Sequence, residues 1–473
     1  MKGNFLKAKA RKKKFIKRKE KIIDEDDSDG ELSSDDEELY SQNIVGKLVN
    51  NKYLILKYLG RGTFSKVWLV LNILKNKYYA LKIQDHKYTD DIIEEINIIK
   101  HIQKEINVEK EENFNEYNYG ILIESFNIKI NDESCICLIL ELLGPSVGLI
   151  CDEDYDNLLN INMIKRIIYK IVTGIKSIHD SDILHNDLKP DNILFTELSP
   201  TIKEYISKIN NLNIDHIYNR LIEDNTPKQV NMLPKNKRKM IKKKIKIKCA
   251  KELIKELYSK IEEINKDNNT SNLELKIENK ENNEEEEFEN EDNIYNLLEC
   301  NLKNIKVKII DFGNSEYEKD KKQDEIYTRC YRPPENIINN EYSKKSDIWF
   351  VGCFLYELLT GEIMFELNCN NNSDFYKDRK HINLMYSYLG KIPREMSMNC
   401  EFSEDIFDSK GRIIDNKKYE NINLRAKLNK RIKIEEDELD LIEDLIFKIL
   451  EYNPKQRLSA DKILEHKWFK NID

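Results

Sequence analysis

A short polar segment carries the residue types that phosphoryl transfer requires. Asp187, Lys189 and Asn192 follow one another closely, directly before the apolar run at 193–195. Such a carboxylate can accept a proton from an attacking hydroxyl, the cation can stabilise the transferred phosphoryl group, and the amide oxygen can bind a hard metal ion. An ordinary polar surface loop between a helix and a strand is the alternative. Partner motifs elsewhere in the chain, in a consistent order, favour the catalytic interpretation.

A second carboxylate supplies the rest of a predicted metal site. Asp311 follows the predicted strand 306–310 and opens the tripeptide D-F-G, which by itself is a common turn. Its place after a strand, and downstream of the polar segment, makes the motif specific. Carboxylate and amide oxygens suit a hard cation that keeps its other positions for phosphate and water. We therefore predict that Asn192 and Asp311 bind Mg²⁺.

A glycine-rich turn between two strands predicts a nucleotide site. The strand at 53–59 leads into the turn, and the strand at 68–71 follows it, so that backbone N–H groups can close over phosphate oxygens. A lone G-x-G is weak evidence, and the third glycine of the usual motif is a serine here. The residues expected at the nucleotide in this turn are Gly60, Arg61, Gly62, Thr63, Phe64, Ser65 and Val67.

A lysine and a glutamate in the next two predicted elements complete the nucleotide site. Lys82 lies with Ala80 on an alternating strand at 79–83, and apolar residues at helical spacing follow at 92–99. A strand lysine and a helix glutamate can pair and hold the α- and β-phosphates. Glu95 is preferred to the alternative Glu94 because it directly precedes Ile96 in the pattern E-I-x-I-I.

Composition limits the class of protein. The 473 residues carry a net charge of −8 with 35% charged residues, which gives no global nucleic-acid signature. Nine cysteines without a C-x-x-C pair, and no leader at the start, indicate a reducing compartment, so we expect a cytoplasmic and nuclear protein. The apolar run at 135–143, which Glu141 interrupts, is half a membrane span, and no membrane association is expected.

Charge patterning predicts a disordered arm at 1–50. A basic block at 11–19 precedes an acidic block at 24–38 that contains Ser28, Ser33 and Ser34. A solvated arm is the preferred interpretation. A nuclear-import signal and acid-directed phosphorylation of the serines are sharper alternatives. The remaining predicted segments are 51–143, 144–195, 196–303 and 304–473.

Segment 196–303 is predicted to be an insertion. Asp311 lies 119 residues after Asn192, where a short hairpin would suffice. A basic run at 234–248 precedes an apolar stripe at helical spacing, and 268–292 is rich in Asn and Glu. We predict a partly helical, otherwise disordered insertion for localisation or partner docking, with a passive spacer as the alternative. Without aromatic interleaving or an RNA-binding fold, direct RNA binding is not expected.

These motifs, taken in order, resemble a eukaryotic serine/threonine protein kinase over 53–195 and 305–470. The finer resemblance is to the SR-protein kinases of the CMGC group. G-R-G-T-F-S-K-V-W at 60–68 looks like that family's G-x-G-x-F-S-x-V-W, H-N-D at 185–187 like its H-T-D, and T-R-C-Y-R at 328–332 like its T-R-Q-Y-R. A long spacer between the two halves of the kinase domain is also typical of that family.

The resemblance implies an α+β, bilobal fold with a small β-rich N-lobe and a larger, mainly helical C-lobe. It implies ATP and Mg²⁺ as cofactors, protein substrates, and a monomer. Asp187 would accept the hydroxyl proton, Lys189 would stabilise the phosphoryl group, and Thr328 would brace both. Lys82 would be positioned by Glu95, and Glu335 would form a structural ion pair with Arg457. In the hinge, backbone groups of Glu141 and Leu143 would face the adenine, with Leu140 behind it.

The resemblance also bears on regulation and substrates. Asn186 replaces the arginine that usually reads a phosphate on the activation segment, so activity without that phosphate is expected. Arg/Ser-rich splicing-factor-type substrates are expected, although Lys380 and Ser387 stand where the family has acids of its docking groove. Glu362 and Asp378 would keep acidic character nearby. A CMGC kinase with other substrates and a pseudokinase scaffold are the alternatives; the complete catalytic set argues against the scaffold.

Overall fold

The computed structural model describes residues 44–62, 65–84, 86–108, 111–130, 133–151, 159–276, 305–321, 326–339, 341–367, 374–398, 406–414, 421–470 and 472. Residues 1–43 and 277–304, where the sequence predicts disorder, therefore lie outside the described residues, as do Thr63 and Phe64 of the glycine-rich turn.

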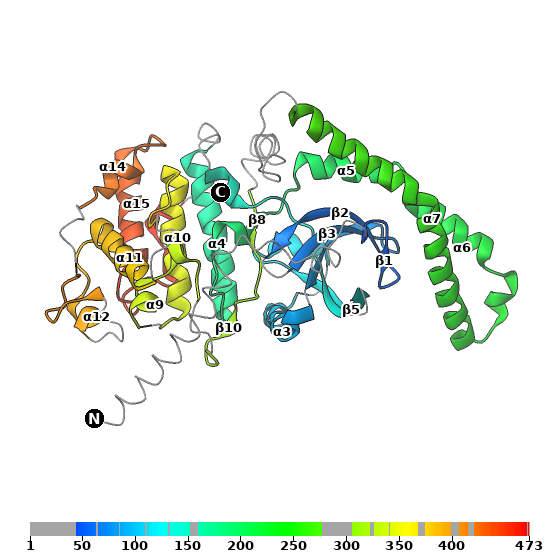
Figure 1. Cartoon of the computed structure of the whole chain (residues 1–473), viewed down its shortest axis with the longest axis horizontal. Coiled ribbons are helices and arrows are strands. Elements are labelled where there is room, and N and C mark those ends of the chain that lie inside the picture. Colours follow the sequence, from blue (N-terminus) through cyan, green and yellow to red (C-terminus); the bar gives the residue numbers. More distant parts are fainter. Residues whose placement is uncertain are drawn as a thin grey trace.

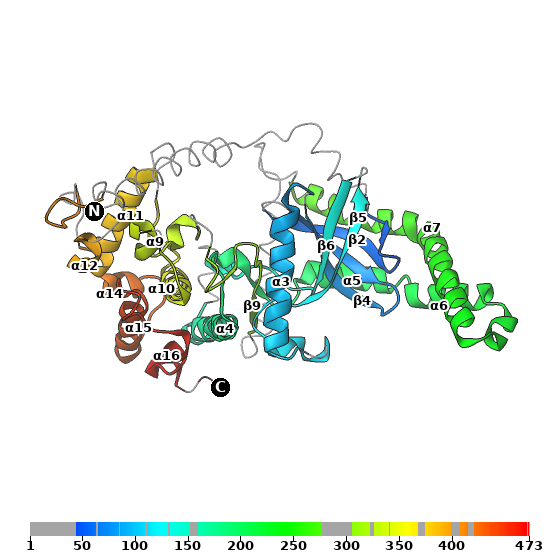
Figure 2. The same ribbon diagram turned by 90° about the horizontal axis from the view of Figure 1, so that it is seen from below.

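The N-lobe is one antiparallel sheet with the strand order β1-β2-β3-β4-β6-β5 (Figure 1). Helix α3 (Thr89–Glu105) stands beside β5 and β6, as Figure 2 shows. Ile92, Ile96 and Ile99 of the predicted pattern are buried and face the sheet, whereas Ile93 is 45% exposed. The strands are β1 (Leu48–Val49), β2 (Tyr53–Gly62), β3 (Ser65–Asn72), β4 (Lys77–Gln84), β5 (Leu122–Ile130) and β6 (Glu133–Leu140).

The C-lobe is built on two long helices, α4 (Ile161–Asp180) and α10 (Lys344–Thr360), which pack against each other. Helix α4 begins where the Asn160 side chain accepts a hydrogen bond from the N–H of Met163, and α10 begins with a reciprocal cap between Ser343 and Ser346. The smaller helices around them are α9 (Pro334–Asn339), α11 (Asp374–Leu389), α12 (Arg394–Met398), α14 (Leu424–Leu428), α15 (Glu436–Ile449) and α16 (Ala460–Leu464).

Short strands join segments that lie far apart in the sequence. Strand β7 (Ile183–Leu184) pairs with β10 (Glu316–Tyr317), and β8 (Ile193–Phe195) pairs with β9 (Val307–Ile309). The polar segment around Asp187 lies between β7 and β8, and Asp311 lies just after β9. These two ladders therefore bring the predicted catalytic and metal-binding residues together. The predicted α+β bilobal fold is confirmed.

The insertion is more ordered than the sequence interpretation proposed. Residues 200–276 form α5 (Pro200–Asn210), α6 (Ile214–Asn225) and the long helix α7 (Lys235–Lys276), which lie along the outer side of the N-lobe sheet (Figure 1). Buried side chains of α5 and α7 form one apolar cluster with strands β2 and β3. This part of the insertion is a helical layer on the N-lobe, so the predicted helical character is present and extends well beyond the apolar stripe, whereas residues 277–303 lie outside the described residues.

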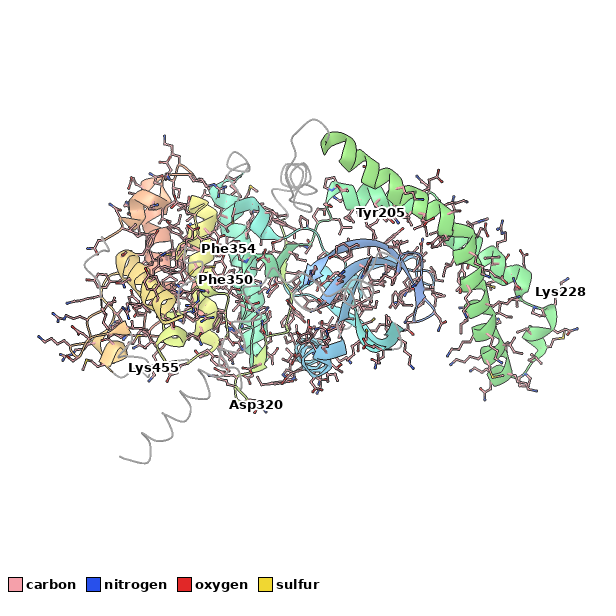
Figure 3. All side chains as sticks on the ribbon, viewed as in Figure 1. Tyr205, Lys228, Asp320, Phe350, Phe354 and Lys455 are labelled. Atoms are coloured by element: carbon pink, nitrogen blue, oxygen red, sulfur yellow. The ribbon has the colours of Figure 1, made fainter. Side chains whose placement is uncertain are left out.

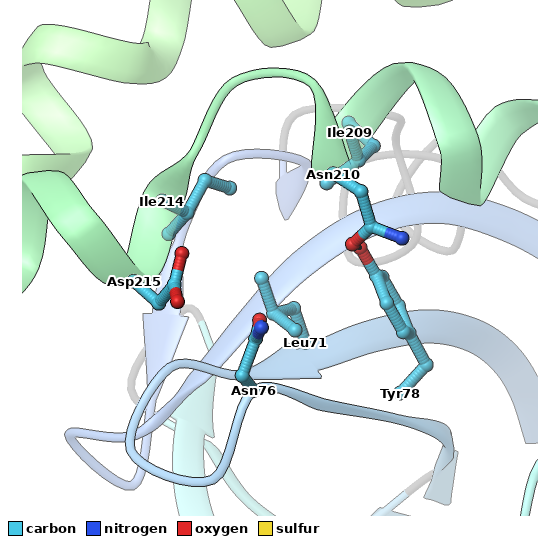
Figure 4. A pocket seen from close by; sticks show the side chains of 7 residues that line it. All are labelled: Leu71, Asn76, Tyr78, Ile209, Asn210, Ile214 and Asp215. Atoms are coloured by element: carbon cyan, nitrogen blue, oxygen red, sulfur yellow. Dashed lines mark hydrogen bonds between the residues drawn. The ribbon is translucent and has the colours of Figure 1, made fainter.

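Polar contacts fix this helical layer at two places. The pairing of β2 with β3 shifts register between Ile55 and Lys57, and the carbonyl of Leu56 accepts hydrogen bonds from Tyr205 Oη (3.0 Å) and Asn265 Nδ2 (3.2 Å). At the other place Tyr78 Oη donates to Asn210 Oδ1 at 2.7 Å, beside a cavity of about 230 Å³ (Figure 4). The insertion thus satisfies a carbonyl at the bulge in β2.

Candidate active site

Lys82 is held between two carboxylates that come from different lobes. Its Nζ lies 2.9 Å and 3.0 Å from the two carboxylate oxygens of Glu95 on α3, and 3.0 Å from Asp311 Oδ1. Glu94 is exposed, so the structure selects Glu95 from the two candidates. Burial alone would lower the pKa of Lys82, but both carboxylates raise it, and Lys82 in turn lowers the pKa of Asp311.

Asp187 has one carboxylate oxygen fixed and one facing several polar groups. Thr328 Oγ1 donates to Oδ1 at 2.9 Å. Oδ2 lies 3.5 Å from each of Lys189 Nζ, Asn192 Nδ2 and Asn314 Nδ2. The predicted contact of Thr328 with Asp187 is present, whereas the described structure shows no hydrogen bond between Thr328 and Lys189. Asp187 is therefore oriented from the activation segment and faces the cation with its second oxygen.

The segment that carries Asp187 is anchored on a buried carboxylate that the sequence interpretation missed. Asp347, at the start of α10, accepts hydrogen bonds from the backbone N–H groups of His185 (2.9 Å) and Asn186 (3.0 Å), and pairs with His179 Nε2 at 2.9 Å. Burial is the largest single effect and opposes its charge, but the contacts with His179 and His185 together outweigh burial and lower the pKa of Asp347. The only sequence signal was an acid at the start of an apolar helix.

Asn186 closes the other side of this segment. It is fully buried and adopts a left-handed backbone (φ 65°), a conformation that asparagine tolerates better than most residues. Its Nδ2 donates to the carbonyl of Asn314 at 3.1 Å and lies 3.5 Å from Glu316 Oε2. The side chain at the position of the usual arginine is therefore a neutral amide that contacts the start of the activation segment.

The end of the activation segment is held by backbone contacts. The N–H of Tyr327 donates to the carbonyl of Asn186 at 2.8 Å, and Arg332 Nη2 donates to the carbonyl of Tyr327 at 3.3 Å. Tyr327 is 5% exposed, and its hydroxyl lies 3.4 Å from Asp347 Oδ1. Burial, with the charge of Asp347, raises the pKa of this tyrosine far above its usual range. The phenol is thus enclosed beside a carboxylate.

The residues at the predicted metal site fit a divalent cation bound together with nucleotide phosphate. Asn192 Nδ2 donates to the carbonyl of Asp187 at 2.9 Å, so the amide oxygen of Asn192 is left to bind a metal ion. Asp311 uses Oδ1 for Lys82, and its side chain remains 44% exposed. Among the described residues no group of three or more His, Cys, Asp or Glu forms a metal site. The oxygens of Asn192 and Asp311 would suit a divalent cation whose other ligands come from phosphate and water.

The walls of the nucleotide site come from the sheet. Gly60 pairs with Val67 across β2 and β3, and Gly62 pairs with Ser65, so the described part of the glycine-rich turn is a continuous hairpin. Ala80 on β4 pairs with Leu140 on β6, which places two of the predicted nucleotide contacts side by side. The predicted contacts of Thr63 and Phe64 lie outside the described residues.

The hinge is anchored by a buried ion pair that the sequence interpretation did not identify. Both carboxylate oxygens of Glu141 lie 2.7 Å from Lys308 Nζ on β9, and Oε1 also accepts from the N–H of Ile121 at 2.9 Å. The Glu141 side chain therefore points toward Lys308 and Ile121 and has a structural role. The nucleotide contacts predicted for Glu141 and Leu143 were expected from their backbone groups. Gly144 ends the hinge where an added Cβ would lie 1.8 Å from the Glu197 carbonyl oxygen.

The predicted structural ion pair is present in the C-lobe. Arg457 Nη1 and Nη2 contact the two carboxylate oxygens of Glu335, each at 2.8 Å, and both side chains are buried. Ser346 Oγ also donates to Glu335 at 2.7 Å. Because the pair is bidentate and shielded from water, removal of one partner would leave an uncompensated buried charge.

The two acids that were expected to keep acidic character near the substrate site both contact cations. Glu362 contacts Lys427 Nζ at 2.6 Å and Lys430 Nζ at 3.2 Å, which lowers its pKa, and Asp378 contacts Arg329 Nη1 at 2.5 Å. Ser387 is buried and donates to the carbonyl of Asn383. The two acids expected to keep acidic character here are therefore already paired with cations of the same chain.

Two lobes with a lysine–glutamate pair, a catalytic loop and an aspartate at the start of the activation segment define a protein kinase. A family model described as a protein kinase domain matches residues 53–209 and 292–469, which is more than half of the chain. The chain belongs to this family, and it is a serine/threonine kinase of the CMGC-like type that uses ATP and a divalent metal.

The proteins that the chain matches include SR-protein kinases. The chain is 25% identical to a serine/threonine-protein kinase SRPK of Physarum polycephalum, covering 90% of this chain and 88% of that protein. It is 24% identical to SRSF protein kinase 3 of Mus musculus, covering 93% and 92%. A crystal structure of a kinase domain superimposes with a TM-score of 0.57 at 22% identity, over 92% of this chain and 100% of that one, which supports the fold alone.

No helix in the part of the chain that the structure describes is long and apolar enough to cross a bilayer.

Proposed function

We propose that this kinase phosphorylates serine in basic, Arg/Ser-rich proteins and is active without a phosphate on its activation segment. The observation that carries the proposal is the assembled catalytic loop. Asp187 is braced by Thr328, and the backbone before it is fixed by Asp347. These contacts involve no phosphate-binding cation.

In the proposed mechanism, Asp187 orients the substrate hydroxyl and accepts its proton. Its Oδ1 is fixed by Thr328, so Oδ2 is the oxygen available for the hydroxyl, and Lys189 lies 3.5 Å from that oxygen. A general base must come within hydrogen-bond reach of the proton that it accepts. Lys189 is placed on the same side, where its charge can stabilise the transferred phosphoryl group.

Lys82 would hold the α- and β-phosphates, with its direction set by Glu95. Asn192 and Asp311 would hold Mg²⁺, which when bound neutralises charge that develops between the β- and γ-phosphates. The exposed side of Asp311 and the amide oxygen of Asn192 support this assignment. The protein's own contribution is to position these groups before the nucleotide arrives.

Phosphate independence rests on Asn186 and Tyr327. The Asn186 amide binds the Asn314 carbonyl, so at this position the switch segment is held by a neutral contact. A phosphate on the hydroxyl of Tyr327 would place a dianion beside the buried carboxylate of Asp347, where like charges repel. The contacts of Tyr327 therefore support a segment that is ordered in the unmodified state.

The substrate proposal is supported by relatives whose names include SRPK and SRSF protein kinase. One observation favours a second candidate, a CMGC kinase with substrates that are not Arg/Ser-rich. Because Glu362 and Asp378 are paired with Lys427 and Arg329, an arginine-rich substrate would have to compete with cations of the enzyme itself.

One experiment tests both parts. The full chain is treated with a phosphatase, and its initial rates are measured with Mg-ATP on peptides that contain Arg-Ser repeats, proline-directed serines or acid-flanked serines. We expect treated and untreated protein to have the same rate and to prefer the Arg-Ser peptides. Loss of activity after treatment would refute phosphate independence, and no preference for basic peptides would favour the second candidate.

A further inference from the structure

The first half of α7 presents a dense array of lysines to solvent. Residues 235–248 contain nine Lys and Arg and no Asp or Glu. All eight lysines among them are exposed. Figure 3 shows this part of the helix, with Lys228 labelled near it, at the far end of the molecule from the C-lobe. We call the seven residues Lys235, Lys237, Lys239, Lys242, Lys243, Lys244 and Lys246 the lysine surface.

The lysine surface has no anionic partner among the residues that the structure describes. Further along the helix the pattern changes: Lys248 contacts Glu252 at 3.5 Å, and Glu256 contacts Arg220 of α6 at 3.6 Å. Lysines spaced three and four residues apart, such as Lys239 and Lys243, repel each other and weaken a helix. An anion bound at the surface would relieve that repulsion.

An acidic segment of the same chain lies within reach. Residues 24–38 contain ten Asp and Glu and no Lys or Arg. The described chain starts at residue 44 against α7 itself, since Val45 and Leu48 pack in the cluster that contains Leu253 and Leu257. A Cβ added to Gly46 would lie 2.7 Å from the ring of Tyr258. The described chain therefore begins beside the same helix, a few residues after the acidic segment ends in the sequence.

The distances are compatible. A helix rises about 1.5 Å per residue, so Lys242 is about 24 Å along α7 from Tyr258. An extended chain reaches about 3.4 Å per residue, so the stretch between residues 31 and 44 spans up to about 44 Å. Tethering also gives the segment a high effective concentration at the surface, so individually weak charge pairs suffice.

We propose that the acidic segment 24–38 binds the lysine surface of α7 in the same chain. Opposite charge and short reach favour this occupant over a nucleic acid, because residues 235–248 contain no aromatic side chain on which bases could stack. Ser28, Ser33 and Ser34 lie in the acidic segment, and a phosphate on any of them would add negative charge and tighten the contact. The contact is independent of the phosphoryl-transfer chemistry.

Carboxyl–amine cross-linking of the full chain, followed by mass spectrometry, tests the proposal. We expect cross-links between 24–38 and 235–248 at low ionic strength, with their yield reduced about tenfold near 1 M salt, where the Debye length falls to about 3 Å. In the variant with Lys239, Lys242, Lys243 and Lys246 changed to Gln, the unchanged lysines of 235–248 should also lose most of their cross-links to the acidic segment at low ionic strength. The matched control changes four exposed lysines elsewhere to Gln and should keep them: Lys104, Lys455, Lys467 and Lys470.

Three results would overturn the proposal. One is that the acidic segment shows no cross-links to α7 in the wild-type chain. Another is that its links go only to the basic block at 11–19. The third uses a short single-stranded RNA: if it binds through the lysine surface equally well before and after the acids of 24–38 are changed to amides, the surface is a nucleic-acid interface. A rise in RNA affinity of tenfold or more after that change would support the proposal, because the acids would then have been occupying the surface.

Discussion

At the scale of single residues, the catalytic loop depends on groups that never touch the substrate. Asp347 binds two successive backbone N–H groups ahead of Asp187, and Asn186 joins that backbone to the activation segment. A buried carboxylate that accepts several hydrogen bonds fixes geometry because each lost bond leaves a buried polar group unsatisfied. The loop is therefore positioned from α10 as well as from its own sequence.

The residue-scale prediction concerns Tyr327. Changing Tyr327 to Phe removes only the hydroxyl and its contacts with Asp347 (3.4 Å) and Ser346, so we expect a turnover within about threefold of wild type and a loss of stability below about 1 kcal/mol. Steady-state phosphorylation and denaturant unfolding measure these two quantities. The enclosed ring keeps its packing, and the backbone contacts of residue 327 do not change.

The matched variant is Asp347 to Asn, which keeps the shape but loses the charge that holds the His185 and Asn186 N–H groups. Hydrogen bonds to charged groups contribute about 1.5–3 kcal/mol, so turnover should fall at least about tenfold. If Tyr327 to Phe abolished activity while the fold stayed intact, the hydroxyl would have a role that this account lacks.

The sequence predicted the catalytic residues better than it predicted their supports. Asp187, Asn192, Asp311, Lys82 and Glu95 occur in short motifs whose spacing reflects local chemistry, and the structure brings them together. The supports act across long separations, as His179 with Asp347 and Glu141 with Lys308 do. When two partners are more than a hundred residues apart, their spacing in the sequence does not indicate that they are in contact.

At the scale of elements, the main difference between prediction and structure is the insertion. The runs Tyr53–Leu56 and Trp68–Leu71 are apolar at every position, which is typical of strands buried on both faces. The structure shows why: Leu54, Leu56, Leu69 and Leu71 pack under α5 and α7, and the alternate residues pack in a second cluster. The two uninterrupted apolar runs in the sequence indicate that both faces of β2 and β3 are covered. They do not indicate which segment of the chain covers the outer face.

The element-scale prediction follows from this packing. Leu253 of α7 is fully buried in the cluster with β2 and β3, so changing it to Ala should cost about 2–5 kcal/mol of unfolding free energy. Met240 of the same helix is 54% exposed, and its change to Ala should have little effect. Thermal and denaturant unfolding, followed by tyrosine and tryptophan fluorescence, measure the difference.

The outcome also separates a structural layer from a passive spacer. If α7 stabilises the N-lobe, Leu253 to Ala should shift the unfolding of the sheet, reported by the buried Trp68. An unchanged N-lobe transition, with loss of helical signal alone, would show that the insertion folds without supporting the lobe. Deletion of 196–303 is a poorer test, because it would uncover the apolar face of β2 and β3.

At the scale of the whole molecule, the two lobes and the insertion meet at the hinge. Gly144 lies against Glu197 at the start of the insertion, and Glu141 is tied to β9 by Lys308. The overall α+β architecture was predictable because short strand patterns dominate before residue 143, with one helical pattern at 92–99, and helical stripes dominate after it. The ion pairs of Glu362 and Asp378 near the substrate site were not predictable, because their partners are cations distant in sequence.

Phosphate independence is tested most directly by phosphoryl transfer by the full chain when no phosphate is present on it. The phosphatase-treated protein and its Asp187 to Asn variant are compared with Mg-ATP and an Arg-Ser peptide. We predict that the treated wild-type chain phosphorylates the peptide and that the variant, which keeps the fold but loses the proton acceptor, is at least about 100-fold slower. Equal rates for the two proteins would contradict the role of Asp187 as proton acceptor. No turnover by the treated wild-type chain would contradict phosphate independence.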